Sequence, residues 1–281
     1  MKISEKKCVA CGNCVPVCPM GAIHIDPVRN RATVNSDECV ECYTCFRGMS
    51  FEHLNPWLVR TVRGLLKLVR LRFEPEPDVC PTAAIEPDEL SWPRVVRRAF
   101  SDPLVSHEST GIHGRGTEEV KTNDITGRVK EGEAGFTVEF GRPSVGVRFR
   151  DIERMTEALA AMGFSFEDSN PVTHMMADRR KGKIRNDILD EKVLSAIVEL
   201  KTKLDDVPRV LARIGEVTKQ IDTVVCVGVA TRCDAKGNSA LESVLREEKY
   251  EFLRGKTNLG LGRSLSSPTT PLQPQGTAAL G

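Results

Sequence analysis

Cysteines are the residues of this chain whose spacing indicates chemistry. Eight of the ten lie between Cys8 and Cys80, namely Cys8, Cys11, Cys14, Cys18, Cys39, Cys42, Cys45 and Cys80. The first four have the spacing C-x2-C-x2-C-x3-C-P, and the next three repeat the x2 spacings before an interruption at residues 46–79 and a final Cys-Pro pair. The first seven residues contain no apolar signal segment, so a cytoplasmic chain is expected. There, such a pattern indicates metal binding rather than disulfide bonds.

The two halves of this pattern form an internal repeat, because residues 18–23 read CPMGAI and residues 80–85 read CPTAAI. Three cysteines on one tight loop suit three irons of a cubane cluster, while the fourth iron needs a thiolate from elsewhere. The proline ends the loop and removes a competing donor. A pair of zinc sites is the alternative, but zinc requires only four sulfurs per site and not this spacing with its Cys-Pro ending.

Residues 1–90 therefore resemble the bacterial 2[4Fe–4S] ferredoxin family. The resemblance implies two [4Fe–4S] clusters, the first on Cys8, Cys11, Cys14 and Cys80, and the second on Cys39, Cys42, Cys45 and Cys18. It also implies electron transfer at low potential, and we expect anaerobic metabolism because exposed clusters degrade in oxygen. The insert at 46–79 departs from the simplest family pattern. A longer loop costs little closure entropy, but a displaced Cys80 would leave a labile or [3Fe–4S] first cluster.

The segment 54–73 within the insert is a basic amphipathic helix by its pattern. Its apolar face contains Leu54, Leu58, Val62, Leu65, Leu66, Val69 and Phe73, and the opposite face contains Arg60, Arg63, Lys67 and Arg70. Three interpretations remain open: the apolar face packs on the domain core and the basic face is solvated, the helix docks a redox partner protein, or it lies on a membrane surface. Nucleic acid is not an expected partner, because Lys+Arg and Asp+Glu are balanced at 40 and 39 and aromatic residues are 5% of the chain.

The rest of the chain is expected to be mixed α+β. Residues 91–135 are interpreted as a connector with a helix at 92–100 and a polar segment at 107–124. Residues 136–263 contain strand patterns at 136–140, 164–166, 196–200, 223–229 and 250–253, and helix patterns at 151–162, 206–218 and 239–247. This order suggests an α/β plait (ferredoxin-like) domain, single or in tandem. Its second unit resembles ACT-type regulatory modules in pattern, and residues 264–281 have the composition of a disordered tail.

Three functions follow from these observations. The first is an electron-transfer protein or oxidoreductase subunit that delivers electrons to a partner oxidoreductase. The second is an iron–sulfur enzyme with a substrate site in the C-terminal domain, and the third is an ACT-like metabolite-sensing regulator of electron transfer. No catalytic residues are recognised in the sequence, which favours the first.

Overall fold

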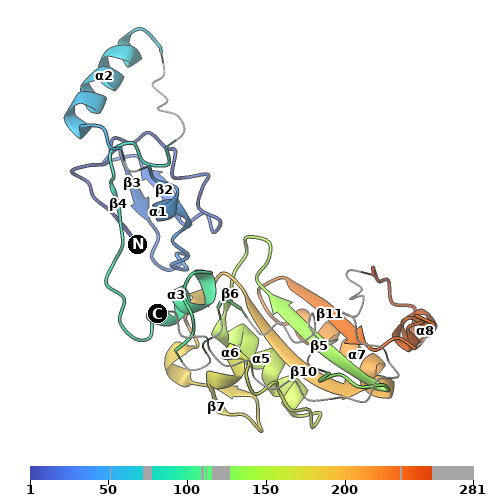
Figure 1. The fold of residues 1–281 in the computed structure, drawn as a ribbon. Coiled ribbons are helices and arrows are strands. Elements are labelled where there is room, and N and C mark those ends of the chain that lie inside the picture. Colours follow the sequence, from blue (N-terminus) through green and yellow to red (C-terminus); the bar gives the residue numbers. More distant parts are fainter. Residues whose placement is uncertain are drawn as a thin grey trace, which may run out of the picture.

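A computed structural model describes residues 1–50, 52–71, 78–108, 111, 113–115, 127–234 and 236–254. It shows a small N-terminal domain, a larger domain beside it, and helix α2 (Pro56–Leu68) projecting from the far side of the small domain (Figure 1). Two separate hydrophobic cores correspond to the two domains. Among the described residues, no helix has the length and apolar character needed to cross a membrane. The expected tail at 264–281 and most of the polar segment 107–124 lie outside the described residues.

The small domain is built from short strands around the cysteine loops. Strand β1 (Lys2–Ile3) pairs antiparallel with β4 (Ile85–Glu86), β2 (Ile23–Asp26) pairs antiparallel with β3 (Arg31–Val34), and α1 (Thr44–Arg47) follows the second cysteine loop. The Asp26 carboxylate accepts hydrogen bonds from the two amides that begin the β2–β3 turn. Because β1 and β4 pair, the chain after the insert returns to the N-terminal strand.

Helix α2 begins where its sequence predicts. The side chain of Asn55 accepts a hydrogen bond from the Trp57 amide at 2.9 Å, and Pro56 occupies the first helical position, where a missing N–H costs nothing. The interpretation that the apolar face packs on the core and the basic face is solvated is wrong. Arg60 and Arg63 point to the domain, whereas much of the apolar face is exposed, including Leu54, Leu58, Leu65 and Val69.

The larger domain contains one three-stranded antiparallel sheet of order β10-β5-β11, from β10 (Ala196–Lys203), β5 (Glu133–Phe140) and β11 (Val225–Thr231). Helices α5 (Phe149–Ala160), α7 (Val207–Thr218) and α8 (Ala240–Glu247) follow the expected helix patterns and contribute to one core with the sheet. The remaining elements are β6 (Val147–Arg148), α6 (Pro171–His174), β7 (Met176–Asp178), β8 (Lys183–Ile184), β9 (Lys192–Val193) and 3-10 turns at Asn186–Ile188 and Leu204–Asp206.

Two of the expected strands do not form as predicted. Phe166 makes only an isolated bridge to Leu200, and residues 250–253 are not in a strand. The described sheet therefore has three strands with β5 at its centre, and the plait arrangement stays a prediction. The strands that do form are the ones whose inward residues, such as Phe136 and Val138, are completely buried.

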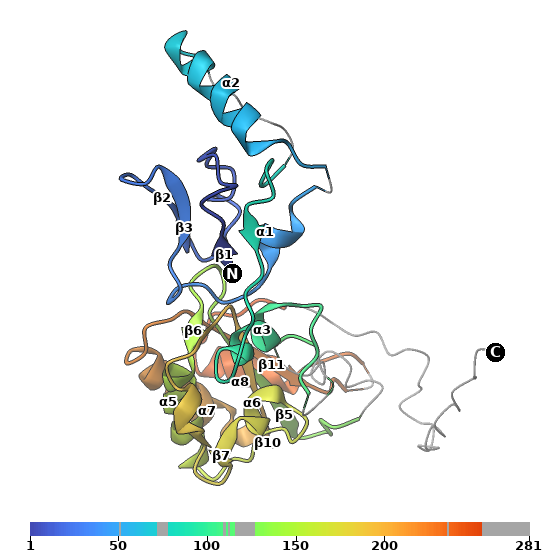
Figure 2. The same cartoon turned by 90° about the vertical axis from the view of Figure 1, so that its left-hand side faces the viewer.

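Helix α3 (Val95–Ser101) lies within the segment expected to be a connector. Its Val96 and Phe100 are buried in the core of the larger domain, where the Phe100 ring contacts the Phe149 ring edge to face at 5.2 Å. Both views place α3 at the junction of the two domains (Figures 1 and 2). Part of this segment therefore packs as an element of the larger domain.

Candidate metal centres

The two cysteine loops have the same backbone shape. In residues 8–12 and in residues 39–43, the second position after the first cysteine and the position after the second cysteine both have positive φ. These are Ala10 (53°), Gly12 (87°), Glu41 (55°) and Tyr43 (61°). Three of the four are not glycine, and such residues enter the left-handed region only at a cost in free energy. The shared strain indicates that both loops are shaped around the same kind of group.

The two Cys-Pro turns are also equivalent. The Gly21 amide donates to the Cys18 carbonyl at 3.1 Å, and the Ala83 amide donates to the Cys80 carbonyl at 3.2 Å. Four residues after each cysteine, an amide points at the sulfur, and these contacts are Ala22 N to Cys18 Sγ at 3.3 Å and Ala84 N to Cys80 Sγ at 3.1 Å. Hydrogen bonds of this kind stabilise a thiolate that carries negative charge.

Four cysteines line one cavity in the small domain: Cys8, Cys11, Cys14 and Cys80. The Cys8 sulfur also accepts hydrogen bonds from the amides of Ala10 at 3.5 Å and Ala32 at 3.3 Å. Burial raises the pKa of the Cys14 thiol to about 12, and the thiols of the other three cysteines act in the same direction. The three thiols of the first loop therefore share a site with the thiol that follows the insert.

The second set of thiols meets around Cys45. Burial raises the pKa of this thiol to about 12, and the neighbouring thiols of Cys42, Cys18 and Cys39 raise it further. Burial also raises the pKa of Cys39 itself. Each set thus combines three cysteines of one loop with the Cys-Pro cysteine of the other half. Because these thiols are hard to ionise by themselves, a cationic metal core must displace their protons on binding.

The insert does not displace Cys80, because its two ends are fastened together at Asp78. One oxygen of this carboxylate accepts hydrogen bonds from the amides of Ser50 at 3.1 Å and Cys80 at 3.0 Å, and the other accepts from the Ser50 hydroxyl at 2.7 Å. The Asn13 side chain donates to the Asp78 carbonyl at 3.1 Å. These contacts, together with the β1–β4 pairing, place Cys80 beside the first loop.

Two arginines of α2 cover the first loop. Arg60 Nη2 donates to the carbonyl oxygens of Glu5 at 3.3 Å and Cys8 at 3.0 Å and also contacts that of Lys6, and Arg63 Nη2 donates to the Ala10 carbonyl at 3.0 Å. Within the described part of the chain, Arg60 Nε and Arg63 Nη1 are buried without an acceptor. Buried N–H groups without partners are costly, and the sulfides of a cluster would supply acceptors for them.

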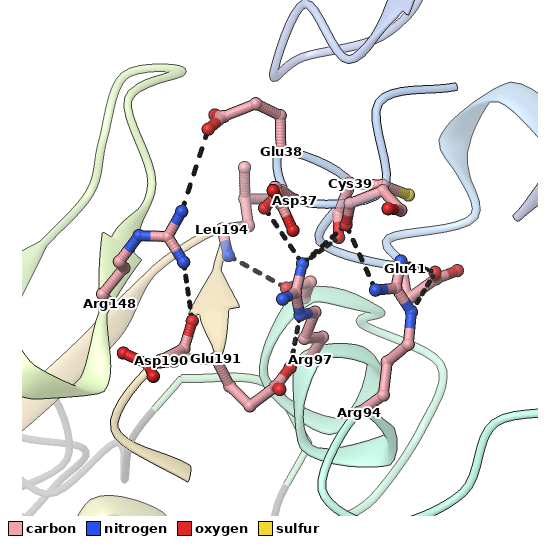
Figure 3. Close-up of polar contacts among 12 residues, drawn as sticks. Asp37, Glu38, Cys39, Glu41, Arg94, Arg97, Arg148, Asp190, Glu191 and Leu194 are labelled. Atoms are coloured by element: carbon pink, nitrogen blue, oxygen red, sulfur yellow. Dashed lines mark hydrogen bonds and ion pairs between the residues drawn. The ribbon is translucent and has the colours of Figure 1, made fainter. Parts of the chain in front are cut away.

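A polar network fixes the second loop to the larger domain (Figure 3). The Glu41 carboxylate, which is fully buried, accepts hydrogen bonds from Arg94 at 2.7 and 3.0 Å and is paired with the Met1 amino group at 2.6 Å. Arg97, which is 5% exposed, donates to the carbonyl oxygens of Ser36, Asp37 and Cys39 at 2.9–3.0 Å and is paired with Glu191 of the larger domain.

The sequence analysis did not identify Glu41, Arg94 or Arg97. Glu41 stands where the first loop has Ala10, and that difference within the repeat was its one available signal. The two arginines belong to α3, a helix that gave no sign of contacting a cysteine loop. The remaining cysteines, Cys226 (exposed) and Cys233 (half-buried), belong to neither set.

Comparisons with known proteins agree with this picture of the small domain. The family described as a 4Fe-4S dicluster domain matches residues 7–48. Two records of Ferredoxin-1 from Rhodobacter capsulatus are each 45% identical over 42 residues, which is 15% of this chain and 62% of the relative. The chain thus spans 62% of the length of these relatives. No solved structure matches the chain.

The N-terminal part is therefore a 2[4Fe–4S] ferredoxin-type domain that carries two [4Fe–4S] clusters, and the zinc alternative is disfavoured. The matches end before Cys80 and leave the C-terminal region unrecognised. The donor sets fit these clusters, because each has four thiols and amides directed at sulfur.

Proposed function

We propose that this chain is a low-potential electron-transfer protein or subunit, which passes electrons between redox partners through its two clusters. The first cluster is held by Cys8, Cys11, Cys14 and Cys80, and the second by Cys39, Cys42, Cys45 and Cys18. The observation that carries the proposal is the gathering of the eight thiols into two groups of four, each completed by the Cys-Pro cysteine of the other half. Bound in this way, each cluster supplies one-electron reduction and oxidation.

The protein sets the potential through burial and through hydrogen bonds, which act in opposite directions. Burial of Cys8, Cys14, Cys45 and Cys80 disfavours the extra negative charge of the reduced state and lowers the potential. The amides that point at the sulfurs favour that charge and raise the potential. Plant-type ferredoxins, which are also ligated by four cysteines, have potentials near about −400 mV, and we expect a comparable low value here.

The two ends of the small domain have different surroundings, which supports an electron path with two ends. The loop at residues 5–10 lies under α2, whereas the loop at residues 36–41 lies against α3 and the larger domain. We therefore assign the larger domain to the binding or orientation of a partner oxidoreductase near the second cluster. The first cluster then exchanges electrons at the end that carries α2.

Anaerobic purification followed by iron analysis and redox cycling tests this proposal. Wild-type protein should bind about eight irons, accept electrons from dithionite and return them to a one-electron dye without catalysing a reaction alone. Cys80→Ser should lose the intact first cluster, whereas Cys226→Ser, a matched loss of an exposed thiol in β11, should retain both. Equal iron loss in the two variants, or turnover of a substrate by the purified chain without a partner, would contradict the proposal.

A further inference from the structure

Helix α2 presents an apolar face to solvent that nothing in the described structure covers. Its members and their neighbours at the two ends of the helix are all exposed: Leu54, Trp57, Leu58, Leu65, Leu68, Val69 and Leu71. Trp57 is 71% exposed and Leu68 is 81% exposed, which is unusual for side chains of this size. We call these seven residues the outer face of α2.

The inner side of the same helix is already used. Val59 is buried, and Arg60 and Arg63 are hydrogen-bonded to the carbonyl oxygens of the first cysteine loop. These arginines are therefore not free to bind an acidic partner, and they hold the helix in one orientation. The outer face consequently points away from the protein's own domain rather than awaiting a rotation that would bury it.

The charge of the segment narrows the choice of occupant. Residues 53–73 contain no acidic side chain, and Lys67 and Arg70 stand exposed at the C-terminal end of the outer face, without an ion pair among the described residues. Tryptophan and leucine flanked by lysine and arginine are the composition of helices that lie in the interface of an anionic bilayer. The cationic side chains extend along the apolar surface to the phosphate groups while the apolar residues enter the acyl boundary.

The position of α2 suits a flat surface. It is the outermost element at one end of the molecule, and the larger domain lies at the opposite end in both views (Figures 1 and 2). A bilayer can therefore contact the outer face along the helix without meeting the larger domain. We propose that α2 binds the surface of an anionic lipid bilayer through its outer face, with Lys67 and Arg70 at the phosphate groups, so that the first cysteine loop lies next to the membrane.

Vesicle flotation of the full chain tests this binding directly. Wild-type protein should float with vesicles of equal parts phosphatidylglycerol and phosphatidylcholine, and more weakly with phosphatidylcholine alone or at high salt, because salt screens the attraction of Lys67 and Arg70. The double variant Leu65→Ser, Leu68→Ser should partition at least about tenfold more weakly, because two leucines no longer leave water. The control is Leu104→Ser, which removes a leucine of similar exposure outside α2 and should leave flotation unchanged.

A spectroscopic measurement identifies the contact. The chain has two tryptophans, so a Trp92→Phe background leaves Trp57 as the reporter, and its emission should shift to shorter wavelength when anionic vesicles are added. Vesicle binding does not depend on cluster loading, so an iron count on each variant separates failure of this proposal from failure of the electron-transfer proposal.

Three results would overturn the proposal. The first is wild-type protein that stays unbound while Trp57 emission is unchanged. The second is flotation that the double variant and the Leu104→Ser control lose equally. The third is a dimer in lipid-free solution that the double variant dissociates while wild-type protein does not float, which would assign the outer face to a second copy of the chain.

Discussion

Individual side chains distinguish the two halves of an otherwise symmetric ligand set. Position 10 is an alanine whose carbonyl is bound by Arg63, whereas the equivalent position 41 is a glutamate buried against Arg94. The first loop thus gains positive charge from α2, and the second has a neutralised carboxylate at the same place. Because net charge and hydrogen bonding near a cluster set its potential, the two clusters are expected to differ in potential despite identical ligands.

Arg63 tests this asymmetry. Replacing Arg63 with glutamine removes a positive charge beside the first loop, so the reduction potential of the first cluster should fall while that of the second stays within error. Potentiometric titration monitored by EPR measures both. Arg213→Gln removes an exposed arginine of α7 that is paired with Glu216 and serves as the control for lost charge. An unchanged first potential, or an equal shift in both clusters, would remove Arg63 from the tuning of the first site.

His107 gives the larger domain a pH dependence. Burial lowers the pKa of this histidine, whose Nε2 lies 2.6 Å from the Gly114 carbonyl oxygen. The unfolded chain binds a proton near the ordinary pKa of about 6.5 and the folded chain does so only at lower pH, so stability present above that pH is lost as the pH falls below it. His107→Gln should flatten this decline in urea unfolding between pH 7.5 and 5.5. The same decline in both proteins would show that other groups cause it.

Secondary structure elements were predictable where a local pattern decided them. The helix pattern at 151–162 became α5 because Ile152, Met155 and Leu159 all face one completely buried core. The cysteine loops were predictable because a ligand set is encoded in a few adjacent positions. The orientation of α2 was not, because the pattern gives two faces but not their neighbours, and the carbonyl oxygens of residues 5–10 recruited its arginines. The α3 contacts depend equally on tertiary packing.

Two glycines separate backbone strain from packing around α5. Gly163 (φ 86°) has open space where a Cβ would stand, whereas at Gly182 (φ 67°) that Cβ would lie 2.3 Å from the Thr156 carbonyl oxygen in α5. Gly163→Ala should destabilise the larger domain by about 1 kcal/mol from positive φ alone, and Gly182→Ala should cost clearly more. Urea unfolding followed by circular dichroism measures the difference. Equal losses would mean that the 182 turn does not pack tightly on α5.

The whole chain is connected by the contact of α3 with the second cysteine loop. Arg97 joins three carbonyl oxygens of that loop to Glu191 of the larger domain, and Lys192 adds an ion pair with Glu38 at 2.5 Å. The environment of the second cluster is therefore coupled to the larger domain. This coupling would transmit partner binding to the site that delivers the electron.

Removal of Arg97 measures that coupling. Arg97→Gln leaves Glu191 and three carbonyl oxygens without their guanidinium, and breaking a buried pair of this kind costs about 3–5 kcal/mol. Hydrogen exchange should accelerate at residues 36–39 and in α3, while α5 remains protected. Arg154→Gln, which breaks a more exposed pair with Asp151, should cost less than about 1 kcal/mol. If Arg97→Gln behaves like this control, the two domains are not held together by the network.

EPR spectroscopy of the dithionite-reduced, anaerobically purified chain, combined with iron and sulfide analysis, is the most direct test of the two-cluster account. The account predicts about eight irons and eight sulfides per chain, with a spectrum broadened by coupling between two neighbouring [4Fe–4S] clusters. About four irons, or a [3Fe–4S] signal in the oxidised protein, would contradict it and would show that Cys80 does not complete the first site.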